Sequence, residues 1–329
     1  MNKMLNFIAL SLSAVFIMSS CAGNGLISDE TSVTTETSAS PDGEGVFPIE
    51  ITDYSADGIA NTCVLEKKPE RVAVLFSSFA DIWTIAGGDI AVTVGESVTR
   101  GFADGATPLV DSSAGKTIDC ELLLSYEPDF VICSADIEAQ ADADALLDSL
   151  GIPSVALHVE SFEDYLTALK LFTDITGDAQ AYQTYGVDVG NEIDTLLENF
   201  SGADEKEILF IRAGSKASAT KAKNADDNFV CRMLSQLGVH NIADDAPVLL
   251  DGLSLEEIIS RDPDFIFIST MGDENAAKEY MNGVLAGDGY NQLNAVVNAN
   301  YAYLPKELFQ YKPNARWAEA YRYLIDLLS

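Results

Sequence analysis

The feature that most constrains the fold of this chain is a segment that occurs twice. Residues Asp119–Ser134 align without a gap with Ser254–Ser269, 135 positions later, with six identities in sixteen positions. Each copy predicts a short helix, a stop at Pro128 or Pro263, and then a buried strand, because proline cannot continue a helix and an unbroken apolar run is typical of a doubly covered strand. The duplication predicts two lobes of like construction, and lobes joined once enclose a cleft that suits a ligand.

The helix starts of the two copies also agree. Asp119 and Ser254 are good N-cap residues, and Ser254 with Glu257 predicts a capping box. Glu121 and Glu256 coincide as well, and capping does not require both of them. The alternative is that helix, Pro-Asp and strand are merely a common local solution in α/β proteins.

The N-terminal residues predict a targeting signal rather than part of the fold. Lys3 precedes the apolar stretch Leu5–Met18, which is too short for a comfortable membrane span. Ser19-Ser20-Cys21 resembles the end of a bacterial lipoprotein signal, with Cys21 as the lipidated residue. An ordinary cleaved signal peptide is the alternative. We therefore predict a signal over residues 1–21 and, because residues 22–45 have almost no core-forming side chains, a disordered tether there.

Composition excludes several kinds of function. The net charge is −33, from 52 acidic and 19 basic residues. Nucleic-acid binding is excluded, because phosphate contacts need clustered Lys and Arg. The acidity either attracts cationic ligands or, as we favour, reflects a solvated acidic surface.

No metal centre or cofactor site is predicted. Beyond Cys21 there are four cysteines, without CxxC or Cys/His spacing, and we expect mostly free, buried thiols: Cys63, Cys120, Cys133 and Cys231. The two histidines fall in different lobes. His240 is expected to be structural, while a single-ligand role for His158 is the lesser alternative.

Strand and helix alternate on both sides of residues 161–200, so two α/β lobes with mainly parallel sheets are expected at 46–160 and 201–329. In the first lobe we predict a hairpin in Phe47–Val64 around Asp57-Gly58, strands Arg71–Phe76, Ile90–Val94 and Val155–Leu157, helices Phe79–Ala86 and Ala139–Leu150, and a loop over Gly95–Arg100. In the second we predict strands Glu207–Ile211 and Tyr301–Leu304, helices Asn228–Leu237 and Glu274–Leu285, and a final helix opened by Pro313.

The connector at 161–200 carries a strong helical stripe. Apolar and aromatic residues recur at three- and four-residue intervals, namely Tyr182, Tyr185, Val189, Ile193, Leu196 and Phe200. At the rise of an α-helix, residues 178–200 span about 35 Å. One long, stiff helix is therefore expected to join the lobes, weakened locally by Gly186 and Gly190.

The chain resembles the solute-binding proteins of iron-complex and cobalamin ABC importers over nearly everything after Phe47. The resemblance is carried by the lipoprotein start and by five segments in order: Lys68–Leu75, Tyr126–Ile132, Leu150–Pro153, Ser161–Tyr165 and Phe309–Trp317. It implies two α/β lobes joined by one long helix, with a ferric siderophore, haem or a corrinoid bound between them, and no catalysis. It also implies an ABC permease as partner, with Glu121 and Glu256 docking to its arginines. The alternative for these glutamates is a favourable interaction with the helix dipole.

Ligand contacts are expected on loops at the carboxyl ends of strands. Aromatic side chains there would stack on a macrocycle or catechol, and Arg or Lys would meet an anionic ferric complex. The candidates are Ser77, Ser78, Phe79, Ser97, Arg100, Ser134, Arg212, Ser215, Lys221, Met271, Phe309, Tyr311 and Lys312.

The sequence therefore predicts a monomeric, lipid-anchored receptor outside the cell membrane. A ferric siderophore is the expected ligand, with haem or a corrinoid as alternatives. Capture of a bare metal ion is disfavoured, because convergent His or carboxylate ligands are not evident in the sequence. An extracellular hydrolase is the rival of another class. It would rest on Ser77-Ser78 after a strand, without a Gly-x-Ser-x-Gly or HExxH motif.

Overall fold

The computed structural model describes residues 45–54, 61–201 and 206–329. The predicted signal, Cys21, the tether up to residue 44 and the hairpin turn at Asp57-Gly58 lie outside these ranges. Within them, no helix is both long and apolar enough to cross a membrane.

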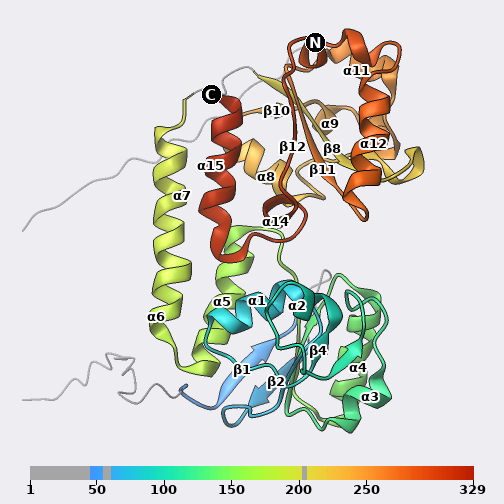
Figure 1. Cartoon of the computed structure of the whole chain (residues 1–329). Coiled ribbons are helices and arrows are strands. Elements are labelled where there is room, and N and C mark those ends of the chain that lie inside the picture. Colours follow the sequence, from blue (N-terminus) through green and yellow to red (C-terminus); the bar gives the residue numbers. More distant parts are fainter. Residues whose placement is uncertain (1–44, 55–60, 202–205) are drawn as a thin grey trace, which may run out of the picture. The chain divides into compact units, whose positions relative to one another are not determined.

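The first lobe is built on parallel strands in the order β3-β6-β7, with the parallel pair β4-β5 attached to β3 through a bridge between Ala73 and Val92. The antiparallel pair β1-β2 precedes this sheet in the chain. The strands are β1 (Ile49–Thr52), β2 (Thr62–Leu65), β3 (Val72–Val74), β4 (Thr93–Val94), β5 (Leu109–Asp111), β6 (Phe130–Ser134) and β7 (Ser154–Leu157). The helices are α1 (Ser77–Ile85), α2 (Gly95–Thr99), α3 (Cys120–Ser125) and α4 (Glu138–Leu150) (Figure 1).

The second lobe has the parallel order β10-β8-β11-β12, with β9 antiparallel to β8. The strands are β8 (Glu207–Ala213), β9 (Lys221–Ala222), β10 (His240–Asn241), β11 (Phe265–Thr270) and β12 (Tyr301–Tyr303). The helices are α8 (Phe229–Gln236), α9 (Ile242–Asp245), α10 (Val248–Asp251), α11 (Leu255–Arg261), α12 (Glu274–Leu285), α13 (Asn294–Val297), α14 (Lys306–Phe309) and α15 (Trp317–Leu328). Two α/β lobes with mainly parallel sheets are thus confirmed.

The duplicated segments occupy equivalent places in the two sheets. Each gives a short helix and then a strand, α3 with β6 and α11 with β11. Asp129 Oδ1 accepts a hydrogen bond from the Arg71 backbone N at 2.7 Å, and Asp264 Oδ2 accepts one from the Glu207 backbone N at 3.1 Å. In both lobes, therefore, the aspartate after the proline fixes the start of the neighbouring strand.

The connector consists of α5 (Phe162–Thr176), a left-handed Gly177, and then α6 (Ala179–Tyr182) and α7 (Asp188–Asn199). A π-helical turn at Gln183–Val187 links α6 to α7, so the predicted long helix is present but not uniformly α-helical. The Tyr165 hydroxyl donates to the Tyr185 carbonyl in this turn at 2.9 Å. That bond satisfies a carbonyl in a stretch where the α-helical ladder is broken.

Aromatic packing ties the connector to the end of the chain. Trp317, at the start of α15 and 1% exposed, lies edge-on to Phe162 of α5 and to Phe229 of α8, with ring centroids 6.3 Å and 5.6 Å away. The same hydrophobic cluster includes buried residues of both sheets. Figure 1 shows α7 and α15 side by side, in agreement with their contacts along the chain.

Three local predictions are wrong. Gly95–Arg100 is not a loop, because α2 begins directly after β4, where Gly95 packs so closely that a Cβ would lie 2.1 Å from the Ser112 carbonyl oxygen. The Ser254–Glu257 capping box does not form, since the Ser254 side chain caps nothing and Glu257 pairs with Arg261 at 3.2 Å. The final helix begins at Trp317, after a 3-10 turn over Asn314–Arg316, rather than at Pro313.

The remaining predicted elements agree within a few residues, and the largest differences are the predicted strands Arg71–Phe76 and Ile90–Val94, which contract to β3 and β4. The four cysteines within the described ranges are free. Cys133 and Cys231 are buried, and Cys63 and Cys120 are half-buried.

Candidate functional site

The end of β3 leads into a polar cluster at the start of α1. Ser77 and Ser78 are buried there, on the first turn of the helix. The Ser77 hydroxyl donates to Glu96 Oε2 at 2.6 Å, and Arg100 Nη1 donates to the Ser77 and Ser78 hydroxyl oxygens at 3.0 and 3.4 Å. The predicted contacts Ser77, Ser78 and Arg100 are thus brought together, through α1 and α2.

Arg100 extends from this cluster to the second lobe. Its guanidinium carbon lies 3.9 Å from the ring centroid of Tyr311 and 4.7 Å from that of Phe102. Its Nε is buried without a hydrogen-bond partner among the described residues. A buried guanidinium N–H that is left unpaired is costly, and an acceptor brought by a ligand would remove that cost.

A second cation also lies near the Tyr311 ring. Lys306 Nζ is 5.0 Å from the Tyr311 centroid. Hydrogen bonding to Tyr311 raises the pKa of Lys306, and the charge of Glu96 adds to this. The site therefore combines two permanent cations with aromatic faces, a combination suited to a planar or anionic ligand.

Asn314 fixes the two lobes to each other beside this cluster. Its side chain is fully buried, and Nδ2 donates to the Ser78 carbonyl at 2.9 Å and to Asp81 Oδ2 at 2.8 Å. Burial raises the pKa of Asp81, although the bond from Asn314 and the nearby Arg100 act against the rise. The residues around Arg100 are therefore held by contacts that cross from one lobe to the other.

Lys312 makes another contact between distant parts of the chain. Its ammonium lies 2.5 Å from Glu160 Oε1 and 4.6 Å from the Phe229 ring centroid. Burial lowers the pKa of Lys312, and the charge of Glu160 opposes this. With its charge already paired, Lys312 is a less available ligand contact than Arg100.

Other predicted contacts lie near the carboxyl ends of β8 and β11. Arg212 is exposed and stands opposite Lys221 in the antiparallel register of β8 and β9. Met271, directly after β11, is 37% exposed. These side chains offer two further cations and a thioether, and the structure records no ion pair for either cation within the described ranges.

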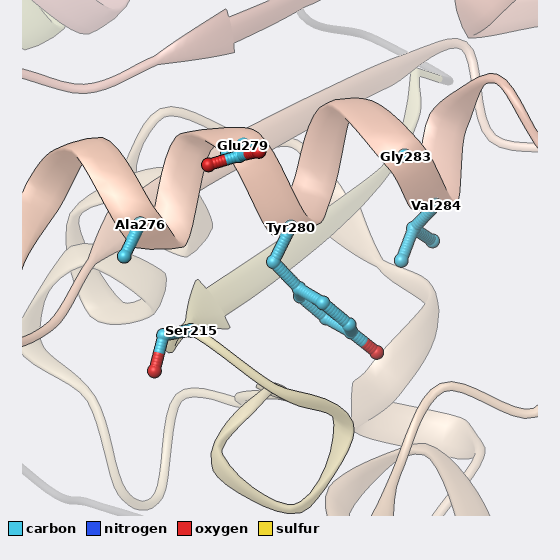
Figure 2. A pocket seen from close by; sticks show the side chains of 6 residues that line it. All are labelled: Ser215, Ala276, Glu279, Tyr280, Gly283 and Val284. Carbon is cyan, nitrogen blue, oxygen red and sulfur yellow. The ribbon is translucent and has the colours of Figure 1, made fainter.

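Ser215 lies apart from this polar cluster, in an open hollow of about 510 Å³. Helix α12 supplies the other lining residues, which Figure 2 shows along its length: Ala276, Glu279, Tyr280, Gly283 and Val284. One half-buried tyrosine and one exposed glutamate give this hollow little specific chemistry.

Besides Ser77 and Ser78, four further predicted contacts are buried. Phe79 and Phe309 are 1% exposed and belong to the main hydrophobic cluster. The Ser134 hydroxyl accepts from the Asp136 backbone N at 3.2 Å. Ser97 is fully buried, and its hydroxyl has no partner among the described residues. Burial leaves these four little surface for a ligand.

The histidines are engaged elsewhere. His158 Nδ1 lies 2.6 Å from Asp136 Oδ1, and its ring stacks on Tyr54 at 4.3 Å. His240 Nε2 lies 2.9 Å from Asp245 Oδ2. Neither histidine lies within hydrogen-bond reach of Ser77 in any contact of the described residues, so the serine has no imidazole base.

The two predicted docking glutamates are placed alike. Glu121 and Glu256 are the second residues of α3 and α11, and both are exposed. In the described part of the chain neither takes part in an ion pair.

Sequence reasoning missed Glu96, Phe102, Lys306 and Asn314 as members of the cluster. Glu96 stands four residues before Arg100, a spacing that places both on one side of a helix, but the segment was expected to be a loop. Lys306 and Asn314 flank the predicted Tyr311 in the sequence. Only the fold shows that Lys306 lies over the Tyr311 ring and that Asn314 bonds to α1.

Comparisons with known proteins agree with this architecture. A family model described as "Periplasmic binding protein" matches residues 72–308. The vitamin B12-binding protein of Pectobacterium carotovorum subsp. carotovorum (strain PC1) is 23% identical over 211 residues, covering 64% of this chain and 74% of that protein.

Two solved structures are similar to this chain. The periplasmic haem-binding protein RhuT from Roseiflexus sp. RS-1, in apo form, is similar with a TM-score of 0.61 and 18% identity, covering 79% of this chain and 97% of that one. Staphylococcus aureus SirA, complexed with staphyloferrin B, is similar with a TM-score of 0.62 and 17% identity, covering 84% and 96%. At such identities the likeness concerns the fold, whereas the family model covers well over half of the sequence. With its two α/β lobes and helical connector, the chain belongs to the periplasmic binding protein family.

Proposed function

We propose that this protein is an extracytoplasmic solute-binding lipoprotein that captures a ferric siderophore and delivers it to an ABC importer permease. The observation that carries the proposal is the position of Arg100. Its guanidinium reaches from α2 to the Tyr311 ring, 3.9 Å away, and retains an unpaired buried N–H among the described residues.

Charge supports an anionic ligand at this place. The chain carries a net charge of −33, yet Arg100 and Lys306 both lie against the Tyr311 ring. Cations gathered on one aromatic residue of an acidic protein offer a local attraction that the rest of the surface does not. A ferric siderophore with a net negative charge and planar chelating groups uses both the cations and the ring.

Haem or a corrinoid is the alternative within the same architecture. Exposed Met271 favours it, since a thioether can serve as an axial ligand of haem iron. One similar protein is a vitamin B12-binding protein and one similar structure is a haem-binding protein. Both ligands are therefore included in the binding titrations.

Binding titrations distinguish these ligands. Quenching of Trp83 and Trp317 fluorescence reports binding of ferric catecholate, hydroxamate and carboxylate siderophores, haem and cobalamin to the purified protein. We expect one siderophore class to bind at least about tenfold more tightly than haem or cobalamin, a difference of about 1.4 kcal/mol. Preference for haem or cobalamin would reject the siderophore assignment, and ester hydrolysis without binding of any of them would favour the hydrolase.

The anchor and the partner complete the proposal. Cys21 is proposed as the lipidated residue and Glu121 with Glu256 as the permease contacts. Support comes from the Ser19-Ser20-Cys21 sequence and from the equivalent, exposed places of the two glutamates. Labelling of cells with a radioactive fatty acid tests the anchor, because Cys21→Ser should abolish the label.

A further inference from the structure

Three carboxylates converge at a place that shares no residue with the Arg100 cluster. Asp53 directly follows β1, while Asp144 and Asp148 lie one turn apart on α4. One oxygen of each lies within 4.8 Å of the others. Three negative charges at this spacing repel one another, and the repulsion grows as water is removed.

Burial makes the ionised cluster more costly. Asp144 is only 5% exposed, and Asp53 and Asp148 are half-buried. Burial, followed by the charges of Asp144 and Asp148, raises the pKa of Asp53 to about 6, against the effect of its bond to the Ala156 backbone. Burial also raises the pKa of Asp144.

The protein supplies no cation to this cluster within the described ranges. No lysine or arginine there forms an ion pair with Asp53, Asp144 or Asp148. The partners are neutral: the Ala156 backbone N donates to Asp53 Oδ1 at 2.8 Å, and Asn61 Nδ2 donates to Asp148 Oδ2 at 2.6 Å.

Ser154 is a separate indication of a ligand. It begins β7, is 2% exposed, and its hydroxyl has no hydrogen-bond partner among the described residues. The hydroxyl lies close to the Asp144 carboxylate and opposes part of the rise that burial gives to the pKa of that group. Asp144 Oδ1 is likewise buried without a hydrogen bond in the described structure. Unpaired buried oxygens are rare in folded proteins and call for an unseen water or ion.

The oxygens select a hard cation. The Cys63 thiol lies beside the cluster and donates to the Ser154 carbonyl at 3.3 Å. Burial and the three aspartates raise the pKa of this thiol, which keeps it protonated and a poor metal ligand. Carboxylate and hydroxyl oxygens suit Ca²⁺ or Mg²⁺, and the irregular set favours Ca²⁺, which accepts six to eight oxygens in flexible geometry. A hollow of about 360 Å³ beside Asn61, Cys63 and Asp148 leaves room for water ligands.

We propose that Asp53, Asp144, Asp148 and the Ser154 hydroxyl bind a calcium ion that fastens the β1-β2 hairpin to the first lobe. The hairpin already lies along β7, since the Tyr54 backbone N donates to the Ala156 carbonyl at 2.8 Å. A cation between Asp53, α4 and β7 joins three segments that are otherwise held by few polar bonds. The site is independent of the proposed ligand and permease.

Calcium titration of the chelator-treated protein tests the site. Isothermal calorimetry with calcium chloride should show one site, and calcium should raise the melting temperature by several degrees, because an ion that binds only the folded state stabilises it. Asp148→Asn should weaken calcium binding at least about tenfold, and Ser154→Ala should weaken it less. Asp142→Asn is the matched control, since it removes the same charge from an exposed position of α4 and should leave the affinity unchanged.

Three results would overturn the proposal. The first is the absence of both calorimetric heat and a melting shift with calcium. The second is equal loss of affinity in Asp148→Asn and Asp142→Asn, which would indicate diffuse attraction to an acidic surface. The third is stabilisation by acidification alone, with no response to calcium, which would show that the carboxylates share protons instead. Circular dichroism of each variant verifies that it is folded.

Discussion

Glu127 and Asp262, 135 positions apart, both adopt left-handed backbone, with φ of 48° and 45°, immediately before the proline of their repeat. Non-glycine residues adopt this conformation rarely, because Cβ crowds the backbone. The two lobes therefore share the conformation at the turn as well as the order of helix and strand. The side chains of Glu127 and Asp262 make different contacts. Glu127 pairs with Arg71 at 3.2 Å, whereas Asp262 Oδ1 accepts from the Asn294 backbone N at 2.7 Å.

Substitution by glycine should change the free energy of unfolding in opposite directions at these two positions. Glu127→Gly should raise the free energy of unfolding by up to about 1 kcal/mol, because it relieves the left-handed strain and loses only an exposed ion pair of small worth. Asp262→Gly should lower it, because the Asn294 N–H loses its acceptor. Urea unfolding of both variants measures the difference. Equal changes would show that the Asp262 bond is not what distinguishes the turns.

The helical glycines make a second matched pair. A Cβ at Gly283, on α12, would meet nothing within 4 Å, whereas one at Gly186 would lie 3.0 Å from Leu166 Cδ2 and 3.3 Å from Leu169 Cδ2. Gly283→Ala should stabilise the protein by about 1 kcal/mol through helix propensity. Gly186→Ala should gain nothing, because the π-helical turn packs tightly on α5. Thermal unfolding of the two variants measures the change in stability. An equal gain in stability at both positions would contradict close packing at Gly186.

The repeat and its apolar runs were sufficient to predict the lobes, the parallel sheets and the helical connector, because buried strands and amphipathic helices have distinct periods. The π-helical turn at Gln183–Val187 could not be predicted, since it depends on Tyr165 reaching the Tyr185 carbonyl from another helix. The site was only partly predictable for the same reason. Arg100 and Tyr311 were identified by their residue types, but Asn314 acquires its role from a bond to Ser78, 236 residues away.

Asp81 should give the protein a measurable dependence on pH. Burial raises its pKa above the model-peptide value of 3.8, so the folded state binds the proton more tightly than the unfolded state. Its contribution to stability is therefore present at low pH and is lost as the pH rises through the folded pKa. Asp81→Asn keeps an acceptor for Asn314 and should be more stable than wild type near pH 7, with a smaller difference near pH 4. Melting temperatures across this range measure the effect, and a difference that does not change with pH would exclude Asp81 as its source.

Arg100 should decide ligand affinity more than any other predicted cation. Arg100→Gln should weaken binding of a ferric siderophore at least about tenfold, since a desolvated charge-assisted hydrogen bond and the cation–π contact to Tyr311 are both lost. Lys312→Gln is expected to affect binding less, because Lys312 already pairs with Glu160. Fluorescence titration of both variants compares them. A stronger effect at Lys312 would place the ligand elsewhere.

The proposed permease contacts can be tested without changing the ligand site. Glu121 and Glu256 are exposed on α3 and α11, and neither takes part in the contacts described for Arg100 and Tyr311. Glu121→Ala plus Glu256→Ala should leave ligand affinity unchanged and abolish uptake, because each exposed carboxylate would lose its arginine partner on the permease. Glu163→Ala plus Glu198→Ala removes two exposed glutamates from α5 and α7 and is the control for net charge. Uptake of iron-55 as the chelate by cells that express each variant is the measurement. Equal transport by the two double variants would contradict the docking role. The matching positions of Glu121 and Glu256 would then be explained by the helix dipole, which favours a carboxylate near a helix N-terminus.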